Sequence, residues 1–397
     1  MGIDLLQQIC AGEDALYTKA TPRSLYTLKM DKIKRFIDCY VPVTTCTLRC
    51  HYCYITVHRK FDGPLPTFEY SPEWVRKALS KKRLGGTCLI NFCAGGETLL
   101  TPSIVEYVKE LLEEGHYIMV VTNATVTKRL EELAALPREL TNHLFFKFSY
   151  HYMELKKRNL LEQFFSNIQM VRDAGCSFTL ELTPSDELIP YIDELKEAAL
   201  NHVGALPHVT VARDERQSGK LPILTSMSRE EYNITWSSFN SKMFEYKMSI
   251  FEQKRKEFCY AGDWSFYLNL KTGIMTQCYS SFYQQNIFED PERPIKFIPI
   301  GCNCEQLHCY NGHAWITLGD IPELRAPYYS ELRNRKSMDG SEWLTPDMKA
   351  FMSTKLAETN TEYSEAEKQR ANANIRRLEK VNRFKRCMHR IANLIKQ

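Results

Sequence analysis

Apolar residues follow two alternating spacings between residues 36 and 212. Six short runs rich in β-branched and aromatic residues predict strands over 36–45, 88–92, 117–121, 144–148, 177–182 and 208–212. Between these runs, apolar residues recur at helical spacing, and Pro or Gly stands near the ends. Helices are therefore predicted over 71–84, 102–114, 128–136, 160–174 and 186–201. Strands that alternate with helices build parallel sheets, so the pattern predicts an α/β fold.

Composition narrows the class of protein. With 44% hydrophobic and 12% aromatic residues, the 397-residue chain has the composition of a folded protein. A net charge of +4 is too small to indicate nucleic acid, and no apolar run approaches the roughly 20 residues that cross a bilayer. The start MGIDLLQQ lacks the basic residues of a signal peptide, so we expect a cytoplasmic protein. In a reducing compartment, 14 cysteines indicate metal ligation or thiol chemistry rather than disulfides.

Polar and glycine residues follow the predicted strands. The stretch TTCTLRCHYCY after the first strand places Cys46, Cys50 and Cys53 in a CxxxCxxC spacing. Three thiolates can hold a 4Fe-4S cluster and leave one iron open for chemistry. Three cysteines are also half of a zinc site, or ordinary buried thiols. The later strands are followed by Gly-Gly-Glu and by three further polar residues: Gly95, Gly96, Glu97, Asn123, Ser149 and His151. The carboxyl ends of parallel strands share one edge of a sheet, where ligands bind.

The cysteine spacing, the aromatic Tyr52 before the last cysteine, and Gly-Gly-Glu after the next strand together resemble the radical S-adenosylmethionine (radical SAM) superfamily. The resemblance covers about residues 36–215. It implies a partial, six-stranded parallel (β/α)6 barrel with a 4Fe-4S cluster whose open iron binds S-adenosylmethionine. It further implies reductive cleavage of that cofactor to a 5′-deoxyadenosyl radical, which abstracts hydrogen from an organic substrate.

The resemblance also implies roles for single residues. Cys46, Cys50 and Cys53 would ligate the cluster, and Glu97 would bind the methionyl ammonium. The remaining residues that would contact the cofactor are Tyr52 at adenine, Gly95 and Gly96 at the methionyl group, and Asn123 and Ser149, of which Ser149 would contact ribose or carboxylate. Asn after a strand is more often a turn residue. The sequence departs from the family at Thr98, where Gly-Gly-Glu-Pro is usual, and this concerns the start of a helix.

A second group of cysteines lies downstream. Alternating residues SFYLNL, then Lys-Thr-Gly and IMTQ, predict a β-hairpin whose ends bring Cys259 and Cys278 together. With GCNCEQLHCYNGH beyond it, the segment resembles the SPASM or twitch auxiliary-cluster domains. We expect one auxiliary 4Fe-4S cluster held by four cysteines, with Cys302 as the alternative to Cys304: Cys259, Cys278, Cys304 and Cys309. A zinc site explains the same residues, also with His308 or His313 in place of a thiolate.

The catalytic groups are less determined by the sequence. Cys93 stands beside Gly-Gly-Glu and is a candidate hydrogen donor, although a core thiol is the simpler interpretation. His151 is a candidate for binding the substrate. Asp214, Glu215 and Asp263 are candidate bases for a substrate radical, although exposed carboxylates are commonly only solvated.

The expected order of parts follows. We expect an N-terminal segment over 1–34, the barrel over 35–225, a connecting helix over 226–258, a small β-hairpin auxiliary-cluster domain over 259–320, and C-terminal helices over 321–397. Residues 368–397 carry ten Lys or Arg against one Glu, with apolar residues at helical spacing. This basic helix packs on the protein's own surface, or docks a partner or an anionic membrane surface.

The expected activity is that of a radical SAM enzyme that oxidises, dehydrogenates or epimerises a small molecule or sugar. A peptide-modifying maturase and a non-enzymatic iron-sulfur or zinc scaffold are the alternatives. The resemblance implies a protein reductant such as flavodoxin or ferredoxin, and we expect no nucleic-acid partner and no transmembrane segment.

Overall fold

The computed structural model describes residues 31–53, 56, 63–217 and 220–395. Almost all of the expected N-terminal segment, 1–34, lies outside the described residues. The chain from Lys32 onward forms one compact unit.

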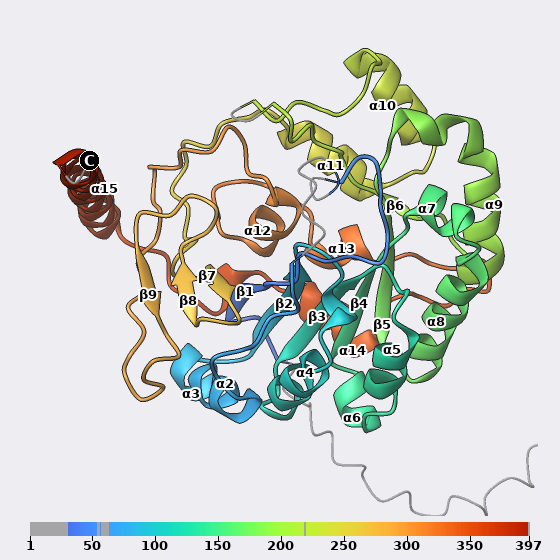
Figure 1. Cartoon of the computed structure of the whole chain (residues 1–397), viewed down its shortest axis with the longest axis horizontal. Helices are drawn as coiled ribbons and strands as arrows, with labels where there is room; N and C mark the ends of the chain where they lie inside the picture. Colours follow the sequence, from blue (N-terminus) through green and yellow to red (C-terminus); the bar gives the residue numbers. More distant parts are fainter. Residues whose placement is uncertain (1–30, 54–55, 57–62, 218–219, 396–397) are drawn as a thin grey trace, which may run out of the picture. The chain divides into compact units, whose positions relative to one another are not determined.

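The centre of the fold is one sheet in which six parallel strands follow one another in chain order (Figure 1). Apolar, β-branched and aromatic side chains bury these strands on both faces, as parallel sheets require. The strands are β1 (Arg35–Val41), β2 (Cys88–Ala94), β3 (Tyr117–Thr122), β4 (Leu144–Ser149), β5 (Ser177–Leu182) and β6 (His208–Val209). The predicted α/β fold with a parallel sheet is confirmed.

The expected hairpin extends the same sheet. Strand β7 (Ser265–Asn269) pairs in parallel with β1, and β8 (Ile274–Thr276) and β9 (Gln284–Asn286) continue the sheet antiparallel. The turn between β7 and β8 contains Gly273, whose φ of +70° is open to glycine at little cost. The carboxyl end of β1, which leads into the cysteine loop, is therefore flanked by β2 on one side and β7 on the other.

Helices connect the parallel strands (Figure 1). Those over residues 72–203 are α2 (Pro72–Ala78), α3 (Lys81–Leu84), η1 (Thr98–Leu100), α4 (Ile104–Glu113), α5 (Thr127–Ala134), α6 (Arg138–Thr141), α7 (Tyr152–Lys157), α8 (Leu161–Asp173), η2 (Asp186–Tyr191) and α9 (Ile192–Val203). The helix predicted over 71–84 is two helices, because the chain turns at Leu79 and Ser80. The helix predicted over 186–201 begins as a 3-10 turn that contains Pro190, a residue without the N–H that an α-helix needs.

The chain after residue 320 returns to the amino ends of the strands. Phe351 stacks on Tyr117 at 3.7 Å between ring centroids, Thr345 N–H donates to Ser177 Oγ, and Lys34 Nζ donates to the carbonyl of Thr359. These contacts cover the edge of the sheet opposite the cysteine loop. The helices after β6 are α10 (Arg229–Ser237), α11 (Lys242–Ile250), α12 (Gly312–Leu318), α13 (Tyr329–Arg333), α14 (Pro346–Met352), η3 (Leu356–Glu358) and α15 (Glu365–Ile395).

The long helix predicted near the C-terminus is α15. Its first half packs against the segment around β8 and β9: Ile375 is fully buried beside Phe282 and Ile298. Asn382 Nδ2 donates to the carbonyl of Phe282 at 2.8 Å. Val381, Phe384 and Met388 are 45%, 66% and 49% exposed. Across the described residues, no helix combines the length and the apolar character needed to span a bilayer.

Candidate active site

Three cysteines from the loop after β1 meet the Gly-Gly-Glu segment around a cavity of about 200 Å³. Cys53 N–H donates to the carbonyl of Cys50 at 3.1 Å, which turns the loop back on itself. Arg49 N–H donates to Glu154 of α7 at 2.9 Å and fixes the outer side of the loop. The structure therefore brings together residues that are up to 105 positions apart in the chain.

Gly96 allows the cysteine loop and the Gly-Gly-Glu segment to lie against each other. Gly96 N–H donates to the carbonyl of Val43 at 2.6 Å, and Glu97 N–H donates to the carbonyl of Thr45 at 3.0 Å. A Cβ atom at Gly96 would stand 1.9 Å from the carbonyl oxygen of Thr45, so no other residue fits here. The sequence prediction gave Gly96 a role in approaching the cofactor; the structure adds this approach to the chain's own backbone.

Thr98, the departure from Gly-Gly-Glu-Pro, also has a structural role. Its hydroxyl accepts a hydrogen bond from Ala94 N–H at 3.2 Å. This bond joins the two ends of the turn that contains Gly95 and Gly96.

Glu97 is 2% exposed and lines this cavity of about 200 Å³, which is the smaller of two adjoining cavities. Oε1 accepts from Leu99 N–H at 3.0 Å and from the Thr122 hydroxyl at 2.6 Å, and Oε2 accepts from Asn123 N–H at 2.8 Å. Burial raises the pKa of this carboxyl group above its ordinary value, and the three donors oppose the shift. A carboxylate offers about four acceptor positions, so one remains for a ligand.

Asn123 connects the end of β3 to the cysteine loop. Its Nδ2 donates to Thr47 Oγ1 at 3.0 Å and to Cys46 Sγ at 3.5 Å, and its Oδ1 accepts from Thr125. Asn123 is therefore both a turn residue and part of the cavity wall.

Tyr52 and His151 form a pair at the rim of the smaller cavity. The Tyr52 hydroxyl lies 2.7 Å from His151 Nδ1, and burial lowers the pKa of His151 to about 4. At this nitrogen a neutral imidazole accepts a hydrogen bond from the phenol hydroxyl. Ser149 and His151 both line the cavity.

The thiols of the loop interact electrostatically. Burial is the main cause that raises the pKa of Cys46 to about 11, with smaller upward contributions from Glu97 and Cys53. Burial, and then the charges of Cys53 and Cys46, raise the pKa of Cys50 above its usual range. Thiolates gathered in a buried site need a compensating positive charge, which a bound metal supplies.

The downstream cysteines form a second set. Burial raises the pKa of Cys259, with smaller contributions from Asp320, Cys278 and Cys309. Burial also raises the pKa of Cys278, and the charges of Cys309 and Cys304 raise it further. Burial is the main cause that raises the pKa of Cys309 to about 12, with a smaller contribution from Cys304. The structure thus brings together the four cysteines expected at the auxiliary site.

Cys302 lies apart from this set. It is exposed, and its backbone N–H and thiol contact Asn372 of α15. His308 and His313 are buried near Cys309, and burial lowers the pKa of both imidazoles.

A larger cavity of about 430 Å³ adjoins the smaller one. Ala94 and Val121 belong to the walls of both. Cys93 is half-buried in the wall of the larger cavity, and burial raises the pKa of its thiol to about 12. Glu215 lines this cavity as well, in an ion pair with Arg213 at 3.8 Å.

Polar residues in the middle of the strands line this larger cavity, and the sequence prediction missed them. Asp38, Asn91 and Lys147 line its wall, from β1, β2 and β4. Glu181 of β5 pairs with Lys147 at 2.9 Å and with Arg333 of α13. A polar residue inside an otherwise apolar strand, as in RFIDCYV or LFFKFS, was the available signal, because buried charges are costly unless they have a function or a partner.

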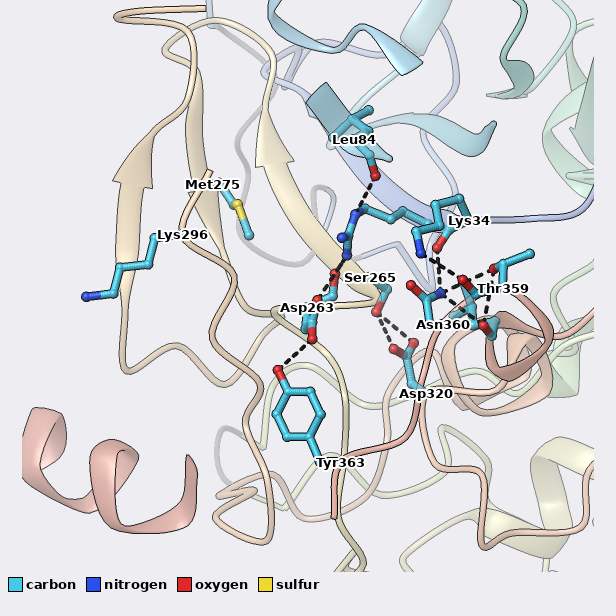
Figure 2. A network of polar contacts seen from close by, with 12 residues as sticks. Lys34, Leu84, Asp263, Ser265, Met275, Lys296, Asp320, Thr359, Asn360 and Tyr363 are labelled. Atoms are coloured by element: carbon cyan, nitrogen blue, oxygen red, sulfur yellow. Dashed lines mark hydrogen bonds and ion pairs between the residues drawn. The ribbon is translucent and has the colours of Figure 1, made fainter. Parts of the chain in front are cut away.

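Asp214 and Asp263 lie in other surroundings. Arg216 holds Asp214 by two bonds at 2.7 and 3.0 Å and lowers its pKa to about 2, and Asp214 lines a different cavity. Asp263 pairs with Arg35 at 3.1 Å and accepts from the Tyr363 hydroxyl at 2.7 Å (Figure 2). Arg35 begins β1, so Asp263 lies at the amino edge of the sheet, opposite the cysteine loop.

The fold and the site define a class: a parallel βα sheet with a three-cysteine site at the carboxyl end of its first strand. The family model described as the radical SAM superfamily matches residues 40–186. This part of the chain is therefore a radical SAM domain, and no curated protein is detectably similar to the chain.

Solved structures give more distant similarities. SuiB of Streptococcus suis, bound to S-adenosylmethionine, is 13% identical with a TM-score of 0.44, over 66% of this chain and 64% of SuiB. anSMEcpe with AdoMet and the Cp18Cys peptide is 12% identical with a TM-score of 0.44, over 87% of this chain and 98% of that one. BtrN in complex with AdoMet and 2-DOIA is 14% identical with a TM-score of 0.31, over 66% of this chain and 81% of BtrN.

The loop after β1 offers three thiols, the donors that an open 4Fe-4S cluster takes. In the described part of the chain, no three His, Cys, Asp or Glu side chains stand close enough to hold one metal ion. In a 4Fe-4S cluster each thiolate ligates a different iron, so the sulfur atoms stand further apart than around a single zinc.

Proposed function

We propose that this chain cleaves S-adenosylmethionine reductively and abstracts hydrogen from a small organic molecule bound in the larger cavity. The observation that carries this proposal is the junction of the two cavities through Ala94 and Val121. When bound, a 4Fe-4S cluster and S-adenosylmethionine supply a 5′-deoxyadenosyl radical. The junction would place the substrate beside that chemistry and keep both away from bulk water.

The chain's residues would hold the cofactors as follows. Cys46, Cys50 and Cys53 would ligate the cluster. The remaining acceptor position of Glu97 would bind an ammonium group, and the three bonds to its oxygens would keep the carboxylate in place. Other residues would orient the cofactor: Gly95, Gly96, Asn123 and Ser149 in the wall of the smaller cavity, and Tyr52, which is bonded to His151 of that wall.

Cys259, Cys278, Cys304 and Cys309 would hold a second 4Fe-4S cluster. Tyr279 and Tyr310 directly follow two of these cysteines, and both line the larger cavity. The second cluster would therefore lie beside the substrate, a placement that suits net oxidation. A protein reductant such as flavodoxin or ferredoxin would supply the first electron.

Iron and sulfide analysis after anaerobic purification tests the cofactor assignment. The wild type should hold about eight irons per chain and no zinc, because two 4Fe-4S clusters are expected. The triple variant Cys46→Ala, Cys50→Ala, Cys53→Ala should retain about four. Cys304→Ala should lose the second cluster, and Cys302→Ala is its matched control and should retain about eight. One zinc in place of four irons would contradict the auxiliary assignment.

Formation of 5′-deoxyadenosine tests the activity. Wild-type protein reduced with dithionite should produce it slowly without substrate, and the triple variant should produce none. No product from a wild type that holds its full iron content would refute the proposed function.

A further inference from the structure

The wall of the larger cavity holds an uncompensated positive charge. Lys147 and Arg333 share one acid, Glu181, which Lys147 Nζ approaches to 2.9 Å and which Arg333 also contacts. Two cations and one anion leave one positive charge in excess. Arg333 is 1% exposed, so bulk solvent screens its charge only weakly.

The same wall holds a carboxyl group that forms no ion pair with a described residue. Asp38 is 4% exposed, and its oxygens accept from two neutral donors: Asn91 Nδ2 at 2.8 Å and the Tyr279 hydroxyl at 3.1 Å. Of the ion pairs formed between described residues, none includes Asp38. Arg213 and Glu215 in the same wall compensate each other. The charges of Asp38 and Lys147 act on each other, but no ion pair joins them, so they are two separate points of opposite charge in the wall.

Unpartnered polar atoms point to a ligand at this place. Asn91 Oδ1, Trp315 Nε1 and Arg333 Nε are buried and have no hydrogen-bond partner in the described part of the chain. All three residues are at least nine-tenths buried, and all line the larger cavity. Buried polar groups are nearly always hydrogen-bonded, so these atoms require a polar occupant.

We propose that the larger cavity binds a free amino acid, with its ammonium group at Asp38 and Asn91 and its carboxylate at Arg333 and Lys147. This inference rests on the proposed function, because it names the substrate class of the same site. A zwitterion compensates both ends, whereas a ligand with one charge leaves the other end uncompensated. The volume of about 430 Å³ lies in the range of small-molecule pockets and suits a single amino acid.

Binding to the holoenzyme tests the proposal directly. The probes are the twenty protein amino acids, each compared with its N-acetyl derivative and its carboxamide by calorimetry and by the shift in Tm. At least one free amino acid should bind, and each blocked derivative should bind at least about tenfold more weakly, since one lost charge contact costs about 1.4 kcal/mol or more. The proposal is overturned if no free amino acid binds, or if the blocked derivatives bind equally well.

Two variants assign the ends of the ligand. Asp38→Asn should abolish the discrimination against the N-acetyl derivative, and Lys147→Met should abolish that against the carboxamide. Asp193→Asn on α9 and Lys128→Met on α5 change exposed charges of the same sign and should bind as the wild type does. If both cavity variants keep the wild-type Tm without ligand but lose neither discrimination, the assignment is wrong.

The same preparations separate this inference from the proposed function. Uncoupled formation of 5′-deoxyadenosine without amino acid, together with no binding, overturns the inference and supports the function. Amino-acid binding without 5′-deoxyadenosine supports the inference and overturns the function.

Discussion

At the scale of single residues, Gly96 sets the geometry of the site. Gly96→Ala should force the cysteine loop and the Gly-Gly-Glu segment apart, because the new Cβ would stand 1.9 Å from the Thr45 carbonyl oxygen. We expect the variant to lose the first cluster and retain about four irons per chain, measured as total iron after anaerobic purification. A full iron content in Gly96→Ala would contradict this.

Thr98 gives a prediction about stability. Thr98→Val keeps the shape of the side chain but leaves Ala94 N–H without its acceptor. We expect a loss of about 1–3 kcal/mol in the free energy of unfolding, measured by urea denaturation. Thr98→Ser retains the hydroxyl and is the matched control, which should lose much less.

The environment of His116 predicts that the free energy of unfolding depends on pH. His116 is fully buried, its Nδ1 accepts from Cys88 N–H at 3.1 Å, and its Nε2 lies 2.8 Å from the Leu79 carbonyl, so both nitrogens are used in the neutral form. Burial lowers its pKa from 6.5 to about 4. Between these values the unfolded chain binds more protons, so stability falls as the pH falls from 6.5 to 4, by about 3 kcal/mol for this residue. His116→Gln, which does not titrate, should lose less stability over this window in parallel urea titrations.

At the scale of elements, α15 is buried at Ile375 and exposed at Val381, Phe384 and Met388. Ile375→Ala should cost about 2–5 kcal/mol, because it empties a fully buried position beside Phe282 and Ile298. Val381→Ala on the same helix changes a side chain that is 45% exposed and should cost about 0.5 kcal/mol or less. Thermal unfolding of both variants checks this, and equal losses would mean that α15 does not pack as described.

The sequence predicted which elements form better than it predicted which elements lie next to each other. The six parallel strands and the cysteine loop follow from local patterns of apolar residues and from spacing. The pairing of β7 with β1 does not, because it joins segments more than 200 positions apart. This pairing also explains why Asp263 stands away from the cysteine loop: it precedes a strand parallel to β1, and the amino ends of parallel strands share the opposite edge. Likewise, no local pattern tells that Asp38 and Lys147 point into one cavity.

At the scale of the whole molecule, the parts expected as separate share one sheet and one covered edge. Strands β7 to β9 extend the barrel sheet, and the segment after residue 320 packs against Tyr117 and Ser177 at its amino edge. We expect the sheet and the segment that covers its amino edge to unfold together as one cooperative unit, since few of these contacts can break alone. Coincident urea transitions by circular dichroism and by tryptophan fluorescence would support this; an early, separate fluorescence change would contradict it.

Arg333 enters the larger cavity from α13, far along the chain from Asp38 and Lys147, which enter it from strands β1 and β4. If the larger cavity binds the substrate as proposed, selectivity is encoded in two distant stretches of the gene. Recombination between related genes after the barrel region would deliver a chain with unchanged cofactor chemistry and a new choice of substrate. In a chimera, position 333 and its acidic partner Glu181 must be inherited together, or the cavity holds a charge that nothing balances.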